Sequence, residues 1–288
     1  MRNNSICSKA EGERLLAFTN NSGPLFIIGT VGISLFGNTT IGVLLFITHL
    51  LACITVGLFF RFWSLKAEKN FIRHTTSFSS NLKSSSLSIK DLGNVLSKSI
   101  SSAISSVVLI GGFVVFFSVV ISILNTSGFI NFTVNLFYPI FKVFDISPQF
   151  VKSIFSGIIE LTNGLKIATS IPVKNISLTI IICAFLLGFG GISILLQVFS
   201  IISKSDLSIK PYILGKFLHG TFAAFYTYLF INWIPYFNFD ITPVFSSSTS
   251  SFIQLSTFNL STVFSICFFT FAFLFFLFYF LKHRCQNY

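Results

Sequence analysis

An unbroken apolar run occupies residues 41–60: IGVLLFITHLLACITVGLFF. None of its twenty residues is charged, and Arg61 follows directly. A helix of about 20 mostly apolar residues is long enough to cross the hydrocarbon core of a bilayer. The run therefore predicts a transmembrane helix and, for the chain, an all-α integral membrane fold.

The composition of the chain agrees with this prediction. Of its 288 residues, 53% are hydrophobic and 9% are charged, whereas soluble domains carry roughly 25% charged residues. The mean hydropathy is +0.84. Too little polar surface remains to face water, so we expect a multi-pass membrane protein in contact with a lipid bilayer.

The net charge of +11 does not indicate a nucleic-acid partner. The basic residues lie between apolar segments, which is typical of cytoplasmic membrane loops. The polar stretch from residue 61 to about 102 holds only two acidic residues, Glu68 and Asp91. Its seven basic residues predict a cytoplasmic linker: Arg61, Lys66, Lys69, Arg73, Lys83, Lys90 and Lys98.

Two apolar spans are predicted to be broken within the membrane. The first, 15–36, contains Asn20-Asn21-Ser22-Gly23-Pro24, and the second, 176–202, contains Gly188-Phe189-Gly190-Gly191. Proline lacks a backbone N–H and glycine permits unusual dihedrals, so a continuous helix is not expected at either place. Unbroken spans are predicted at 103–124, 212–231 and 261–281.

Two shorter apolar segments lie between these spans. Residues 150–170 hold a polar group around Glu160, which predicts a re-entrant hairpin with a polar tip. Residues 128–144 are interrupted by Pro139, and either an interfacial helix or a tilted span fits them.

The two broken spans predict an inverted repeat. Ala17-Phe18 and Ala184-Phe185 each precede a glycine-containing break, 167 residues apart. The predicted topology carries the two breaks across the membrane in opposite directions, which is a common transporter design. At the same offset, a partner of the hairpin tip would lie before Met1. A misplaced start, a fragment and imperfect symmetry all fit this expectation.

Broken helices persist in lipid only where protein or a water-filled cavity satisfies their backbone, and paired breaks commonly form a transporter's substrate site. The alternative is that the same polar residues only cap or pack helices. We expect a substrate-binding site made of both breaks and the hairpin tip. Its predicted residues are Asn20, Asn21, Ser22, Gly23, Glu160, Thr162, Asn163, Gly164, Gly190, Gly191, Ser193 and Gln197.

Among single residues, Glu160 is the foremost functional candidate, because a carboxylate within the membrane is costly. It could couple to a proton or cation, pair with Lys166, or sit in water. His49 is expected to make a helix-packing hydrogen bond, and His219 to lie at the membrane interface. The five scattered cysteines are expected to be reduced: Cys7, Cys53, Cys183, Cys267 and Cys285.

No motif for an enzyme is found. The sequence contains no GxxxxGK[ST], G-x-S-x-G, HExxH or HxxxH pattern, so a nucleotide P-loop and the common hydrolase and zinc-protease sites are not indicated. We expect no catalytic residues, no metal and no cofactor.

Several segments resemble the YlbJ-type sporulation integral membrane proteins of the gate, or nucleoside recognition, group. They are EGERLLAFTNNSGPLFIIG at 11–29, GIIELTNG at 157–164, GFGGIS at 188–193, QVFS at 197–200 and FLHG at 217–220. The resemblance implies a transporter-like bundle similar in fold to concentrative nucleoside transporters. It also implies a role in endospore formation and the spore cortex, a location in the outer forespore membrane, and dipicolinic acid, an anionic solute, as the substrate.

The resemblance also defines the expected regions. Residues 1–62 form the remainder of a first gate repeat, 63–102 a basic linker, 103–231 a second gate repeat, and 232–288 an outer loop with a last transmembrane helix. The family's first hairpin is expected to be missing here. A scaffold for spore-envelope proteins and an inactive truncated product are the alternatives. A coupling ion and a homo-oligomer are left open.

Overall fold

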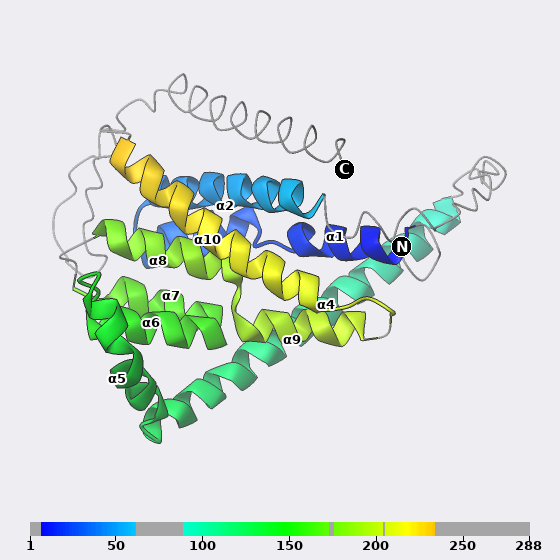
Figure 1. Cartoon of the computed structure of the whole chain (residues 1–288). Coiled ribbons are helices and arrows are strands. Elements are labelled where there is room, and N and C mark those ends of the chain that lie inside the picture. Colours follow the sequence, from blue (N-terminus) through cyan, green and yellow to red (C-terminus); the bar gives the residue numbers. More distant parts are fainter. Residues whose placement is uncertain (1–6, 62–88, 173–175, 204, 234–288) are drawn as a thin grey trace, which may run out of the picture. The chain divides into compact units, whose positions relative to one another are not determined.

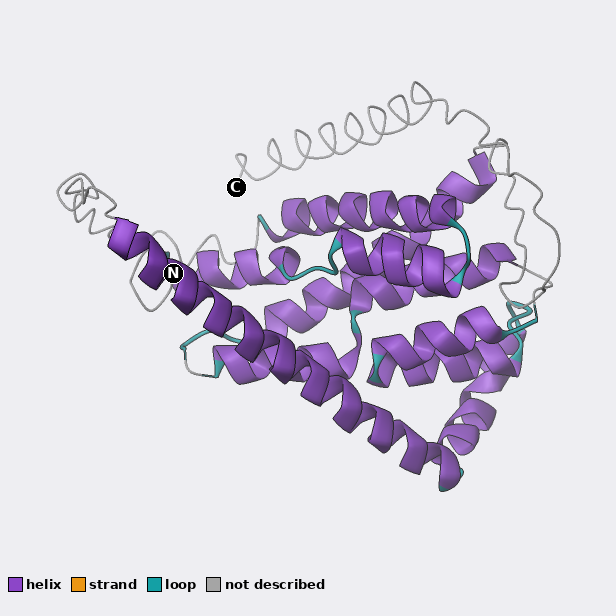
Figure 2. Ribbon diagram, turned by 180° about the vertical axis from the view of Figure 1, so that it is seen from behind, coloured by secondary structure: helices purple, strands orange, loops and turns teal. Residues whose placement is uncertain are grey.

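The computed structural model describes residues 7–61, 89–172, 176–203 and 205–233. Every regular element in these ranges is a helix, as Figure 2 shows. The expected outer loop, the last span at 261–281 and most of the basic linker lie outside the described residues. The all-α prediction is confirmed for the described part of the chain.

The first broken span consists of helix α1, Lys9–Thr19, and helix η2, Leu25–Leu35, which has the wider π-type hydrogen bonding. Ser8 and Glu11 start α1 with reciprocal hydrogen bonds of 3.2 and 2.8 Å, a capping box. Asn20 then adopts an extended conformation, and Pro24 precedes the first residue of η2. The predicted break at residues 20–24 is therefore confirmed.

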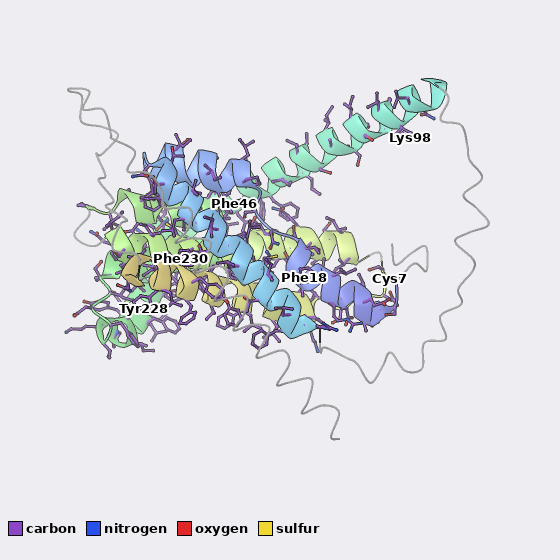
Figure 3. The ribbon with its side chains drawn as sticks, turned by 90° about the horizontal axis from the view of Figure 1, so that it is seen from above. Cys7, Phe18, Phe46, Lys98, Tyr228 and Phe230 are labelled. Atoms are coloured by element: carbon purple, nitrogen blue, oxygen red, sulfur yellow. The ribbon has the colours of Figure 1, made fainter. Side chains whose placement is uncertain are left out.

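Helix α2, Thr39–Phe60, follows and returns along this broken span. Near its end, Gly57 lies against the Phe18 ring, and near its start, Gly42 lies against Ile28 and Gly32. Phe18 is labelled in Figure 3. Contacts in this order mean that α1 and η2 together run antiparallel to α2, like one interrupted helix.

Helices α4, Ile89–Thr126, and α5, Phe129–Lys142, are joined by Gly128, which has a φ of +76°. The chain is helical from Ile89, although the sequence predicted linker up to residue 102. Apolar residues do recur at helical spacing here, at Ile89, Leu92, Leu96 and Ile100, but the many serines and lysines between them favoured the linker interpretation. Residues 92–112 of α4 are exposed, and Lys98 lies on this stretch in Figure 3.

Helices α6, Pro148–Ile159, and α7, Leu161–Ser170, form the predicted hairpin, with Glu160 at its tip. At 12 and 10 residues they are roughly 18 and 15 Å long, too short to cross a bilayer singly. They pack side by side in Figure 1. A Cβ on Gly164 would lie only 2.2 Å from the Cα of Gly157, so the two backbones are in direct contact.

The second broken span consists of α8, Ile176–Phe189, and α9, Gly191–Ile202, followed by α10, Lys210–Trp233. Gly190 and Gly191 both have positive φ, +83° and +84°, which side-chain-bearing residues rarely adopt. They separate the two helices, so the predicted break is confirmed here as well.

Helix α10 runs back along this span. Gly188 packs on the backbone of Gly220, and Tyr212 packs against α9 in a cluster with Leu195, Val198 and Ile202. The end of α8 thus meets the middle of α10, and α9 meets its start, which makes the two antiparallel. Figure 1 shows α10 in yellow crossing α8 and lying near α2.

Three segments in the described residues are long and apolar enough to cross a membrane: Thr39–Phe60, Leu92–Thr126 and Ile176–Ile202. These support the prediction of a multi-pass membrane protein. Helix α10 has 24 residues but is not among the three, and its crossing of the membrane stays a prediction.

Candidate functional site

The hairpin tip and the second break lie in direct contact. A Cβ on Gly191 would lie 3.0 Å from the carbonyl oxygen of Gly157 and 3.3 Å from the backbone nitrogen of Leu161. The end of α6, the start of α7 and the start of α9 therefore meet at one place. The structure thus brings together two of the three segments that the sequence assigned to a binding site.

Glu160 is buried at this junction, with 2% of its surface exposed. Its carboxylate accepts hydrogen bonds from the Thr162 backbone N–H at 3.0 Å, the Thr162 hydroxyl at 2.6 Å and the Asn163 N–H at 2.8 Å. A carboxylate at a helix N-terminus is stabilised by the unpaired N–H groups and the helix dipole. Glu160 therefore caps α7, while Lys166, its suggested partner, is exposed.

The other predicted residues of the hairpin link it to its surroundings. The Asn163 amide donates to the Ser118 hydroxyl of α4 at 3.3 Å. The Ser153 hydroxyl of α6 donates to the carbonyl oxygen of Gly164 at 2.9 Å. Gly164 consequently has a packing role, whereas Thr162 and Asn163 are partly buried polar groups beside the tip.

The predicted residues of α9 follow directly on the second break. Ser193 is 1% exposed, and Gln197 donates to its hydroxyl at 3.4 Å, one turn along the helix. No side chain caps the N-terminus of α9. A helix N-terminus of this kind is suited to an anion, because its N–H groups and dipole favour negative charge.

The first break is held by side chains from α2 and α10. The Asn20 amide donates to the Tyr212 hydroxyl at 2.7 Å, and the Lys216 ammonium donates to the Asn20 carbonyl oxygen. The Asn21 amide donates to the Phe18 carbonyl oxygen at 2.6 Å and to the Cys53 sulfur at 3.0 Å. The break is thus fixed by polar contacts to neighbouring helices.

The remaining residues of the first break range from partly buried to exposed. Ser22 is partly buried, and Gly23 is exposed with nothing within 4 Å of an added Cβ. The first break is connected to the second through α10, since Lys216 contacts Asn20 and the next turn, at Gly220, contacts Gly188. Helix η2 also contacts α7 of the hairpin.

Sequence reasoning missed the polar residues of α10. His219 was predicted at the membrane interface, but it is fully buried, and its Nε2 donates to the His49 carbonyl oxygen at 3.0 Å. The centroids of the two imidazole rings lie 4.3 Å apart. His49 therefore packs against α10 through its backbone oxygen and the face of its ring, and not through a side-chain hydrogen bond. The spacing of Tyr212, Lys216 and His219 places them on one helix face, and this could have revealed them.

Metal binding finds no support in the described ranges, where no three His, Cys, Asp or Glu side chains are grouped to hold an ion. Cys7, Cys53 and Cys183 are in the reduced state, as predicted, and Cys267 and Cys285 lie outside the described residues.

Comparison with known proteins places these features in context. Residues 107–205, which include the hairpin and the second break, match the family described as nucleoside recognition, or Gate. The chain is 30% identical over 270 residues to the sporulation integral membrane protein YlbJ of Bacillus subtilis, an alignment that covers 90% of the chain. The chain spans 65% of the length of that relative.

No solved structure matches the chain. The alignment with YlbJ nevertheless covers nine tenths of the chain, and the Gate segment contains the junction around Glu160. The predicted resemblance is thereby confirmed: the chain is similar to the sporulation integral membrane protein YlbJ over 90% of its length, and its residues 107–205 match the Gate family.

Proposed function

We propose that this protein transports a small anionic solute across a membrane during sporulation, and that it is not an enzyme. The assignment to sporulation rests on the name of its relative, the sporulation integral membrane protein YlbJ. Dipicolinate as the solute, and the outer forespore membrane as the location, are taken from the family resemblance of the sequence. A proton or cation coupled to the solute, and a homo-oligomeric state, are compatible extensions of the proposal.

The observation that carries the proposal is the junction of the hairpin tip with the second break, around the buried carboxylate of Glu160. Interrupted backbone and an ionisable side chain are both costly in lipid unless protein or water surrounds them. Transporters place such groups at their solute site. The uncapped N-terminus of α9 and the amide of Asn163 supply donors suited to an anion there.

The relative directions of the helices support an inverted repeat of the kind found in transporters. Along α1, Glu13 accepts from the Ser208 N–H at 3.0 Å, and Ala17 lies against Gly215. Helix α1 is therefore parallel to α10, and α10 is antiparallel to the second broken span. The two broken spans then run in opposite directions, which is the arrangement proposed for the inverted repeat.

A transport assay tests the proposal. The 288-residue chain is reconstituted in liposomes, and entry of labelled dipicolinate is measured for the unaltered chain and for N163A and S193A. We expect uptake above that of empty liposomes, reduced about tenfold in each variant if one hydrogen bond to the solute is lost. N135A, at an exposed position on α5, is the matched control and should transport normally.

Two outcomes count against the proposal. Normal uptake by N163A and S193A would place the solute site elsewhere. Absence of dipicolinate uptake by a folded, unaltered chain would remove the proposed substrate, and a scaffold role in spore-envelope assembly would then be favoured.

A further inference from the structure

Three basic side chains are buried together beside the first break, at a place to which neither the sequence nor the comparisons gave a role. Lys216 and His219 come from α10 and His49 from α2, with 3%, 0% and 1% of their surfaces exposed. Lys216 is within electrostatic reach of both imidazoles and of Cys53. We refer to Lys216, His219 and His49 as the basic cluster.

The contacts of the basic cluster account for only part of its polarity. Lys216 donates to the Asn20 carbonyl oxygen at the end of α1, where a cation is favoured by the helix dipole. Its ammonium also lies 5.9 Å from the centre of the Tyr212 ring. These contacts explain why a lysine is tolerated here, but they do not involve the two histidines.

The histidine rings have buried nitrogen atoms without a hydrogen-bond partner. Among the described residues, neither ring nitrogen of His49 has one, and Nδ1 of His219 has none. The side-chain oxygen of Asn21, at the break itself, is also buried without a hydrogen-bond partner. Because buried polar groups nearly always find partners, four such atoms around one break mark a place that water or a ligand could occupy.

The charge of the surroundings specifies the kind of ligand. The buried carboxylates among the described residues are Glu13 and Glu160. Glu13 accepts from the Ser208 N–H, and Glu160 caps α7. Neither is hydrogen-bonded to the basic cluster, so the Lys216 ammonium and the single N–H of His49 have no buried acidic partner in the described ranges. The Nε2–H of His219 already donates to the His49 carbonyl oxygen, which leaves the Nδ1 of His219 as an acceptor. This environment favours an anion over a metal ion or a cationic ligand.

The position also offers a route of entry. The cluster adjoins the first break, and the outer end of that break is exposed at Gly23, with no atom within 4 Å of an added Cβ. No packed neighbour covers Gly23 on this side, although its carbonyl oxygen accepts from the Phe26 and Ile27 N–H groups at 3.1 Å. A solute could approach Lys216 from this exposed side of the break.

We propose that Lys216 and His49 bind a carboxylate group of the transported solute at the first break, with His219 positioning His49 through the hydrogen bond to its carbonyl oxygen. This subsite rests on the proposed function and extends it, since it assigns the solute's negative charge to α10 and α2. The Asn21 oxygen, an acceptor, would bind a donor on the solute or on accompanying water. The junction around Glu160 would then contact another part of the solute.

A binding experiment separates this subsite from the transport proposal. The 288-residue chain is purified in detergent, and its melting temperature is measured at fixed ionic strength with added dipicolinate, benzoate or the neutral diamide of dipicolinic acid. The variants are K216Q and H219Q. The matched control is K210Q, since Lys210 is an exposed residue at the start of the same helix.

We expect dipicolinate to stabilise the unaltered chain and K210Q, and the diamide to stabilise neither. The dipicolinate concentration that gives half of the effect should rise about tenfold in K216Q, as for the loss of one charged hydrogen bond. H219Q should show a rise in the same direction. It also serves as the second variant if K216Q does not fold.

The remaining outcomes are decisive. Equal stabilisation of the unaltered chain, K216Q and H219Q by dipicolinate would overturn the subsite and leave the transport proposal standing. Stabilisation by benzoate alone, lost in K216Q, would support the subsite and reject dipicolinate as the solute. No stabilisation by any carboxylate would overturn the subsite.

Discussion

The two breaks both interrupt predicted membrane helices, but they consist of different residue types and are held by different contacts. The first, residues 20–24, uses Asn20, Asn21 and Pro24, and its shape is held by hydrogen bonds to Tyr212, Lys216 and Cys53. The second, residues 188–191, uses glycines, two of them with positive φ, and its shape is held by backbone packing against the hairpin and α10.

This difference predicts how a substitution at each break affects the stability of the protein. A break defined by close backbone contact has no room for a side chain, so any substitution must move whole helices. A break defined by side-chain hydrogen bonds loses about one bond at a time, and its exposed residues are free to vary. We therefore expect large effects of substitution at the second break and graded, smaller effects at the first.

The largest effect is expected for G188A. A Cβ at this position would lie 2.6 Å from the Gly220 Cα and 2.7 Å from its nitrogen, so α8 and α10 must separate. We expect about 3 kcal/mol of lost stability, the upper range for overpacking, measured as unfolding in detergent. G111A is the matched control, because Gly111 is a helical glycine with nothing within 4 Å. Equal stability of the two variants would show that the second break is not defined by close packing.

A smaller effect is expected for E160A at the junction. The variant removes the acceptor that caps α7 and should cost about 1–2 kcal/mol, the usual range for loss of an N-cap. E160D retains a good capping carboxylate and should recover most of this stability. If E160D and E160A unfold alike while only E160D transports, capping would be excluded as the main role of Glu160, and contact with the solute would be favoured.

The breaks and the hairpin were predictable because their signals are local. Pro24, the glycines at 188–191 and the polar group around Glu160 each indicate a break within a few residues of sequence. The start of α4 at Ile89 was missed because residues 89–102 are too polar to stand out as a span. The basic cluster was missed for another reason: the burial of His219 depends on α2, which lies about 170 residues earlier in the chain.

The hydrogen bond between Asn20 and Tyr212 gives a smaller test, at the first break. We expect N20A and Y212F each to cost about 1 kcal/mol, and the double variant to cost less than the sum, because both remove the same bond. Unfolding of the four proteins in detergent measures this coupling. Strict additivity would mean that the contact does not hold the break, and the contrast with the glycine-built break would lose its basis.

The smallest effect is expected for G23A, and it is the sharpest test of the comparison. Gly23 lies in a break, as Gly190 and Gly191 do, and sequence reasoning gave all three the same role. Gly23 is exposed, its φ lies outside the positive region, and an added Cβ would meet nothing within 4 Å. Alanine should therefore change stability by less than about 0.5 kcal/mol, or raise it slightly through the unfolded state.

G191A is the comparison variant in the same unfolding experiment. Its Cβ would lie 3.0 Å from the Gly157 carbonyl oxygen, at a φ of +84°, so the variant should lose about 2 kcal/mol of stability. If G23A were as damaging as G191A, backbone packing would define both breaks, and the approach of a solute past Gly23 to the basic cluster would have to be abandoned.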